Sequence, residues 1–368
     1  MNSQSITGRE LCVELYRCFD VKFCGGSGAL VSPREGWEEC LDGLSDVLVQ
    51  RYGVQPKLVA TDEGLGVVFI RVKRGWGWLR VLVFLAATIA AVAIAGFEVA
   101  GQFASVAHRL GVGVNILGLT FAFLLGLLGP LAVHEGGHYL AARRRGVPVS
   151  PPLFIPAPPP NLGGIGTFGA IILMRGVPKD RDSLALVGLS GPLYGFIAGV
   201  VVALAGLVYS LVVSNPAVAR SVAGSTAPVS IVPLILVLEG SLVLKGEGLV
   251  ILHPLAVAAY IVFLVTFLNL LPIGWLDGGH VVYAVFGERV HRVTSTLTPW
   301  VAIIASLVYP QMLFVGVFSL LAYGLYLVLS RGMHPGVVNP FRPLSPRRAA
   351  LYAGIYTLLL VLTLPVPV

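Results

Sequence analysis

The chain is dominated by long stretches that carry no charged side chain. Asp, Glu, Lys and Arg are absent from six runs: 81–97, 110–133, 183–219, 254–276, 293–330 and 349–368. Roughly 20 apolar residues in a helix cross a ~30 Å hydrocarbon core, so most of these runs predict one membrane crossing each. The run 293–330 is long enough for two helices that fold back at Tyr309-Pro310-Gln311. The pattern predicts an all-α polytopic membrane protein with about seven transmembrane helices.

The amino-terminal stretch has a different pattern, with charges throughout and no apolar core of signal-peptide type. Apolar spacing predicts helices over residues 7–19 and 37–52, and β-favouring residues predict a strand over 66–72. We therefore expect a small soluble α+β domain over residues 1–75. A membrane-embedded domain over residues 76–368 would follow it.

The segment 147–175 does not fit a transmembrane helix. Seven prolines fall between Pro148 and Pro160, which forbids a continuous helix, and the sequence 161–164 is a turn signal. Residues 165–174 then read as a strand. Apolar extended chain at membrane depth is tolerated only when protein covers it or when it lines a cavity. Two interpretations remain, a loop on the cytoplasmic surface or a re-entrant β-hairpin, and we favour the hairpin.

Composition and charge support a membrane protein and indicate its orientation. The chain is 56% hydrophobic and 12% charged, which excludes an ordinary soluble globular protein. With the amino terminus in the cytoplasm, twelve basic residues would fall on the cytoplasmic side after residue 80: Arg143, Arg144, Arg145, Arg175, Lys179, Arg181, Arg289, Arg292, Arg331, Arg342, Arg347 and Arg348. The opposite side would hold Arg109, Arg220 and Lys245.

This asymmetry follows the positive-inside rule. It predicts a multi-pass protein of the cell membrane whose amino terminus and active-site face are cytoplasmic. The net charge of +7 could indicate nucleic-acid binding in a soluble protein. Because the basic residues flank helix ends here, the lipid bilayer explains them and we expect no nucleic-acid partner.

All four cysteines lie in the amino-terminal domain, at positions 12, 18, 24 and 40. They lack CxxC spacing, and residues 1–78 contain no histidine, which argues against a zinc knuckle. A cytoplasmic location favours free thiols, although intracellular proteins of hyperthermophiles carry disulfides. We expect free thiols and keep a structural disulfide as the alternative.

The sequence His134-Glu135-Gly136-Gly137-His138 carries the candidate chemistry. An i, i+4 spacing places both imidazoles on one face of a helix, and Glu135 can reach a water molecule held by a metal ion. An uncharged run leads directly into this motif, where a central charged residue costs about 2.5–3.5 kcal/mol of insertion free energy. The competing interpretation is a polar helix end that faces the cytoplasm beside Arg143–Arg145.

Two histidines do not complete a hydrolytic zinc site, which needs three protein ligands and one open position. A Glu about twenty residues downstream is missing, because position 158 lies in the proline-rich segment. An HExxHxxGxxH extension also fails, since Ala141 and Arg144 occupy the required positions. The third ligand must therefore come from a distant part of the chain.

Asp277 is the strongest candidate for that ligand. It ends the uncharged run 254–276, where Pro272 and Gly274 would loosen the helix and let the carboxylate turn inward. His280 is a rival ligand, and a carboxylate at a solvated helix end is the alternative for Asp277.

The two motifs together show a family resemblance. HEGGH with the later NLLPIGWLDGGH (269–280) resembles the site-2 protease family of intramembrane metalloproteases. PPLFIPAP, GTFGAIILMR and GLSGPLYG are similar to its archaeal, cyanobacterial and chloroplast branch. The resemblance covers about residues 112–290. It implies one Zn²⁺ per chain bound by His134, His138 and Asp277, with Glu135 as general base, and it implies nothing for residues 1–75.

The expected function is hydrolysis of peptide bonds in or near transmembrane segments of membrane proteins, as in regulated intramembrane proteolysis. Asn269 would hold the substrate backbone or the oxyanion, with ordinary helix packing as the alternative. An exposed edge over 163–174 could pair with extended substrate, with Gly166 allowing close approach and Phe168 making contact. Simple packing is the alternative for Phe168.

Two other classes remain as alternatives, a metal-binding membrane transporter and a catalytically inactive membrane chaperone. Broken helices and midplane ligands also occur in transporters. The intact His-Glu-His-Asp set argues against the inactive relative. The sequence leaves the oligomeric state and the identity of the substrate open.

Overall fold

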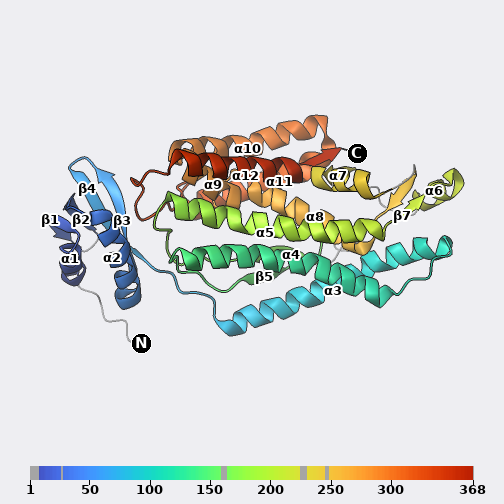
Figure 1. Ribbon diagram of the computed structural model, residues 1–368, viewed down its shortest axis with the longest axis horizontal. Helices are drawn as coiled ribbons and strands as arrows, with labels where there is room; N and C mark the ends of the chain where they lie inside the picture. The colour runs from blue at the N-terminus through green and yellow to red at the C-terminus, as the bar shows by residue number, and fades with distance from the viewer. Residues whose placement is uncertain (1–7, 26–27, 159–163, 224–229, 245–247, 368) are drawn as a thin grey trace.

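The computed structural model describes residues 8–25, 28–158, 164–223, 230–244 and 248–367. An elongated body of long helices makes up most of the molecule, and an α/β unit sits at one end of it (Figure 1). We call the elements from α1 to β4 the amino-terminal unit. The other helices form the helical body.

The amino-terminal unit is a four-stranded antiparallel sheet with two helices, and its strand order is β1-β2-β4-β3. Leu41, Leu44 and Leu48 recur on one face of helix α2 and are buried in a core with Leu58 of the sheet. This spacing is what a helix needs to cover a sheet with one apolar stripe. The bounds are α1 Gly8–Leu15, β1 Phe19–Gly25, β2 Gly28–Pro33, α2 Trp37–Tyr52, β3 Val54–Thr61 and β4 Gly64–Arg71.

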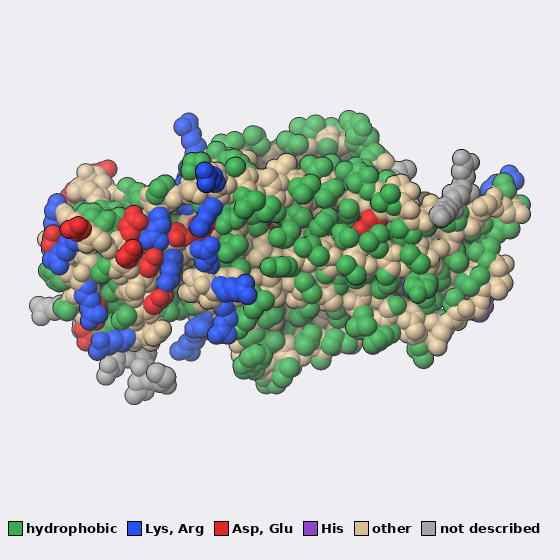
Figure 2. Space-filling view, viewed as in Figure 1, with side chains coloured by type: hydrophobic (Ala, Val, Ile, Leu, Met, Phe, Trp, Pro, Cys, Tyr) green, Lys and Arg blue, Asp and Glu red, His purple; other side chains and the backbone are tan. Residues whose placement is uncertain are grey.

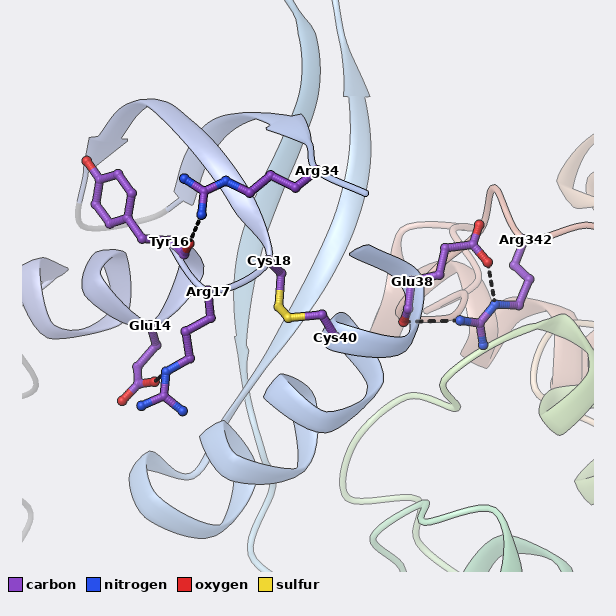
Figure 3. The surroundings of a disulfide bond; sticks show 8 residues. All are labelled: Glu14, Tyr16, Arg17, Cys18, Arg34, Glu38, Cys40 and Arg342. Carbon is purple, nitrogen blue, oxygen red and sulfur yellow. Dashed lines mark hydrogen bonds and ion pairs between the residues drawn. A yellow bond between two sulfur atoms is a disulfide. The ribbon is translucent and has the colours of Figure 1, made fainter. Parts of the chain in front are cut away.

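The cysteines of this unit are paired, so the expectation of free thiols is wrong. Cys12 bonds to Cys24 and Cys18 bonds to Cys40, and all four lie within the described residues (Figure 3 shows the Cys18–Cys40 bond). That expectation rested on a cytoplasmic location, where thiols are usually reduced. The folded unit instead brings each pair of cysteines into contact. The unit has a small core, and closing a loop with a covalent bond restricts the unfolded chain.

Reduction of these bonds is expected to destabilise the amino-terminal unit. The bridges close chain segments of 12 and 22 residues, and loops of this size contribute about 2–4 kcal/mol each. Hydrogen–deuterium exchange of the full-length protein should therefore speed up over residues 8–72 on reduction, with little change in the helical body. The double variant C12S/C24S should show part of this effect without reductant. Equal exchange in the oxidised and reduced protein would contradict the prediction.

Four helices of the described chain are long and apolar enough to cross a membrane: α3 Trp78–Arg109, α4 Ile116–Arg144, α5 Arg181–Val208, and the continuous segment Pro310–Ser330. The protein is thus mostly helical with several candidate membrane spans, as expected. The run 254–276 is not helical throughout, because α8 ends at Leu270. The count of about seven spans stays a prediction.

The helical body packs mainly through α4, α5 and α8. Gly126, Gly199 and Gly206 lie at close contacts between these helices, because a Cβ at each would meet neighbouring atoms at 2.9 Å or less. On the face that Figure 2 shows, the middle of the body is covered mostly by hydrophobic side chains with few charges, whereas charged side chains gather on the amino-terminal unit and where it joins the body. The remaining helices are α6 Pro216–Ala223, α7 Leu234–Val243, α8 Pro254–Leu270, α9 Asp277–Phe286, α10 Glu288–Val308, the 3-10 turn η2 Pro310–Met312, α11 Leu313–Ser330 and α12 Pro346–Thr363.

Three small two-stranded sheets complete the fold. The proline-rich segment forms the antiparallel hairpin of β5 (Leu153–Pro156) and β6 (Thr167–Ile171). The strand is shorter than the predicted 165–174, and residues 161–163 of the predicted turn lie outside the described residues. The other sheets pair β7 (Leu211–Val213) with β9 (Leu249–Ile251), and β8 (Ile231–Pro233) with β10 (Pro365–Pro367).

Arg342 joins the amino-terminal unit to the helical body. Its guanidinium lies 3.1 Å from Glu38 and 2.9 Å from Asp42 on α2, and 3.1 Å from Asp180 at the start of α5 (Figure 3 shows Glu38). Burial raises the pKa of Asp180, but hydrogen bonds from Ser183 and Arg342 outweigh it and hold that pKa below its usual range. One cation therefore bridges carboxylates from two parts of the chain.

Candidate metal centre

The two histidines of HEGGH and Asp277 meet inside the helical body. The Nε2 atoms of His134 and His138 lie 3.1 Å apart, and each lies 3.3 Å from one oxygen of the Asp277 carboxylate. Both imidazoles are buried. Within the described residues, this trio is the group whose ligand atoms converge closely enough to hold a metal ion.

The spacing of these atoms fits a zinc ion. Ligand atoms of tetrahedral zinc at about 2.0–2.1 Å lie about 3.3 Å from one another. The two imidazole nitrogens are 3.1 Å apart, and each lies 3.3 Å from a different oxygen of Asp277, so the group is close to this spacing. Two imidazoles and one carboxylate, with a fourth position left open, are a ligand set of hydrolytic zinc sites. A cation between the two ring nitrogens and the partly buried Asp277 carboxylate would also compensate the negative charge.

A backbone carbonyl orients one of the ligands. The Nδ1–H of His138 donates to the carbonyl oxygen of Val187 on α5, at 2.6 Å. This bond fixes the proton on Nδ1 and leaves the Nε2 lone pair for a metal ion, the usual arrangement of a metal-binding histidine. Sequence reasoning missed this residue, because a backbone acceptor leaves no side-chain signature.

Helix α5 approaches the ligands through a row of glycines. A Cβ on Gly191 would lie 2.1 Å from Nε2 of His138, and one on Gly195 would lie 2.8 Å from Cβ of His134. Gly137 of the motif, on α4, faces α5 in the same way. A Cβ on Gly137 would lie 2.6 Å from the backbone carbonyl oxygen of Ser190. The GLSGPLYG sequence therefore supplies the space in which the two imidazoles lie.

A break between two helices brings in Asp277. Helix α8 ends at Leu270, residues 271–276 form a turn, and Asp277 opens helix α9. Gly274 has φ +49°, and a Cβ on Gly278 would meet the Leu270 carbonyl oxygen at 2.0 Å. The predicted loosening of the helix near Pro272 and Gly274 is present, and it turns the carboxylate toward α4.

The trio lines a pocket of about 160 Å³. Glu135 and Asn269 also line this pocket, as do His280, Trp275 and residues 170–172, which end and follow strand β6. Glu135 is buried. The pocket therefore holds a carboxylate and an amide together with the three converging side chains.

The other two residues singled out in the hairpin lie elsewhere. Gly166 has φ +85° and lies against α3, where a Cβ would come within 2.8 Å of Val92 Cα. Its lack of a side chain thus serves close packing of the hairpin on α3 in this structure, not an approach to the pocket. Phe168 is 72% exposed on the hairpin, so it does not pack inside the protein.

Comparison with known proteins agrees with these motifs. The chain matches the model of peptidase family M50 over residues 122–309, just over half of its length. It is 32% identical over 244 residues to the probable chloroplastic zinc metalloprotease EGY1 of Arabidopsis thaliana, a match that covers 65% of this chain and 41% of that protein. It is also 33% identical over 172 residues to the probable chloroplastic zinc metalloprotease EGY2 of Oryza sativa subsp. indica, covering 45% and 29%.

The aligned part of EGY1 is about two-fifths of that protein's length. No solved structure matches the chain. The family match spans α4, α5, α8 and α9, which carry all three converging ligand residues, and the site-2 proteases are the branch that the motifs resemble. The chain therefore belongs to peptidase family M50, the family of the site-2 proteases.

Proposed function

We propose that this protein is an intramembrane zinc metalloprotease that hydrolyses peptide bonds in or near transmembrane segments of other membrane proteins. The observation that carries the proposal is the convergence of His134, His138 and Asp277, whose ligand atoms lie within 4.8 Å of one another beside the buried Glu135. Zinc metalloprotease relatives in the same family support the metal and the reaction class.

His134, His138 and Asp277 would hold the zinc ion. When bound, zinc supplies Lewis-acid chemistry that makes water nucleophilic near neutral pH and polarises a carbonyl. Glu135 takes the proton of the attacking water and passes it to the leaving amine. Asn269, which lines the same pocket, holds the substrate backbone through its amide.

The hairpin would present the substrate to the pocket. A helical substrate hides its carbonyl groups in internal hydrogen bonds, so it must be extended before attack. Strand β6 pairs with β5 on one side, and residues 170–172 at its end line the pocket. An extended substrate added to the free side of β6 would be led to Glu135, with Phe168 in contact with the substrate or lipid.

We further propose that the end of the protein bearing the amino-terminal unit is cytoplasmic in a cell membrane, with the hairpin re-entrant and about seven crossings. Basic side chains gather where the unit joins the helical body, as the positive-inside rule requires (Figure 2). Disulfides in a cytoplasmic unit are the pattern of hyperthermophile proteins. A single cysteine introduced in the exposed β3–β4 turn by Glu63→Cys should stay unlabelled by an impermeant thiol reagent added to intact cells. Labelling from outside would show the opposite orientation.

Glu135→Gln is expected to abolish proteolysis without loss of zinc. Gln has almost the same shape but cannot take a proton, and general-base catalysis contributes about 10²–10⁴-fold. The measurement is cleavage of a transmembrane peptide by the purified protein in liposomes, read by mass spectrometry, with zinc content measured in parallel.

Glu63→Gln, the same change in the exposed β3–β4 turn, is the control and should leave cleavage unchanged. Unchanged cleavage by Glu135→Gln would refute the proposed role of this residue. Zinc-dependent transport by liposomes that never cleave the peptide would instead favour the transporter alternative.

A further inference from the structure

Three buried histidines meet behind the candidate metal centre. They come from separate elements: His280 from α9, His291 from α10, and His334 from the segment between α11 and α12. Their exposed fractions are 8%, 1% and 7%. His280 lies one helical turn after Asp277 and lines the same pocket.

The hydrogen bonds fix where the protons of this cluster lie. The backbone N–H of Gly336 donates to Nδ1 of His334 at 2.9 Å, so Nδ1 is an acceptor and His334 carries its proton on Nε2. That Nε2 lies 2.8 Å from Nδ1 of His280 and must donate to it. His280 therefore accepts at Nδ1 and carries its own proton on Nε2.

The segment that carries His334 is held firmly from two sides. Its imidazole stacks on the Tyr283 ring with centroids 4.2 Å apart. Strand β3 of the amino-terminal unit reaches it as well: Lys57 donates to the Pro335 carbonyl at 2.7 Å, and the Leu58 N–H donates to the Val338 carbonyl at 2.8 Å. The hydrogen bond to His280 is thus supported by contacts far from the pocket.

The N–H of His280 is left for a group inside the pocket. The oxygens of Asp277 each lie 3.3 Å from a metal-binding imidazole, so this carboxylate is directed at α4. Nδ1 of His280 faces His334, and Nε2, on the other edge of the ring, carries the proton of His280. A protonated Nε2 has no lone pair to offer, so His280 cannot be a zinc ligand in this state.

We propose that His280 is a catalytic hydrogen-bond donor, which binds the carbonyl oxygen of the scissile peptide as negative charge develops on it. His334 is a positioning residue that sets the tautomer of His280. This inference rests on the proposed function and adds a donor to it. A fixed donor of this kind stabilises charge without reorganising during the reaction.

Two substitutions at position 280 separate this role from a structural one. The amide nitrogen of Gln reaches about where Nε2 lies and keeps a donor in the pocket, whereas Asn places its amide near Nδ1 and keeps the bond to His334. We expect H280N to lower kcat by about 10²-fold or more, the usual effect of removing an oxyanion donor. H280Q should stay within about tenfold of wild type, and both should keep wild-type zinc content and KM.

A purely structural role would reverse this order, because H280N preserves the buried hydrogen bond to His334. H280N as active as H280Q or more so, or loss of zinc in either variant, would overturn the inference.

The tautomer provides a test that does not depend on activity. In ¹⁵N-histidine-labelled, metal-free protein, the signal absent from H280Q should show the Nε2–H tautomer. His334→Phe keeps the stacking on Tyr283 but removes the donor, and it should shift that signal toward Nδ1–H. An Nδ1–H tautomer in the wild-type protein would overturn the inference. A wild-type protein that cleaves no membrane segment would overturn the proposed function instead.

Discussion

Asp277→Ala is expected to remove zinc from the protein and to abolish cleavage of a membrane peptide. Its carboxylate lies 3.3 Å from both metal-binding imidazoles and comes from a different helix. Without it, two histidines at i, i+4 would be left as the protein ligands, which is one fewer than hydrolytic zinc sites have. Loss of an indirect partner already costs about 10–100-fold in metal affinity, so loss of a ligand should cost at least about 100-fold.

Zinc titration against a competing chelator measures this affinity directly. Glu288→Ala is the matched control, because this carboxylate lies at the start of the next helix and is half exposed in an ion pair with Arg292. Exposed pairs contribute about 0–1 kcal/mol, so zinc affinity and cleavage should not change. Full zinc retention by Asp277→Ala would show that another group, with His280 first among the candidates, is the third ligand.

Gly191→Ala is expected to damage the metal site without touching a ligand. The new Cβ would lie 2.1 Å from Nε2 of His138, and the opposite side of that ring is held by the Val187 carbonyl. Either the imidazole leaves its position or helix α5 moves away from α4. We expect zinc affinity to fall by about 10–100-fold, with about 1–3 kcal/mol of destabilisation from overpacking.

The two glycines of HEGGH provide a matched pair of variants that test whether close contact between α4 and α5 shapes the metal site. Gly137→Ala places a Cβ 2.6 Å from the Ser190 carbonyl oxygen and should impair zinc binding and cleavage. Gly136→Ala meets nothing within 4 Å and should keep both, with about 1 kcal/mol of added stability from helix propensity. Zinc content, cleavage and the unfolding temperature distinguish them. Equal behaviour of the two variants would mean that the close approach of α4 and α5 does not shape the site.

Local patterns in the sequence were sufficient to predict the chemistry. The i, i+4 histidines, the adjacent Glu135 and the uncharged run before them indicated a metal site on a membrane helix, because helical periodicity is a local property. Asp277 could be predicted because a carboxylate at the end of an apolar run, beside Pro272 and Gly274, needs a cation. The prolines and the turn sequence also predicted the hairpin. The shorter strands and the packing of Gly166 on α3 could not be predicted from them.

Other features depend on contacts between distant parts of the chain. Val187 and His138 are 49 residues apart, and His280 and His334 are 54 residues apart. No periodicity encodes such pairs, since helix packing and loop paths bring them together. The cysteine pairing is a similar case, because four cysteines allow several pairings and the compartment argument opposed them all. The sequence alone thus singled out the three side chains that converge, the adjacent Glu135 and the apolar character of the helices. Only the tertiary structure decided how the ligands are oriented, which glycines make room for them and which disulfides form, because packing across the fold sets these contacts.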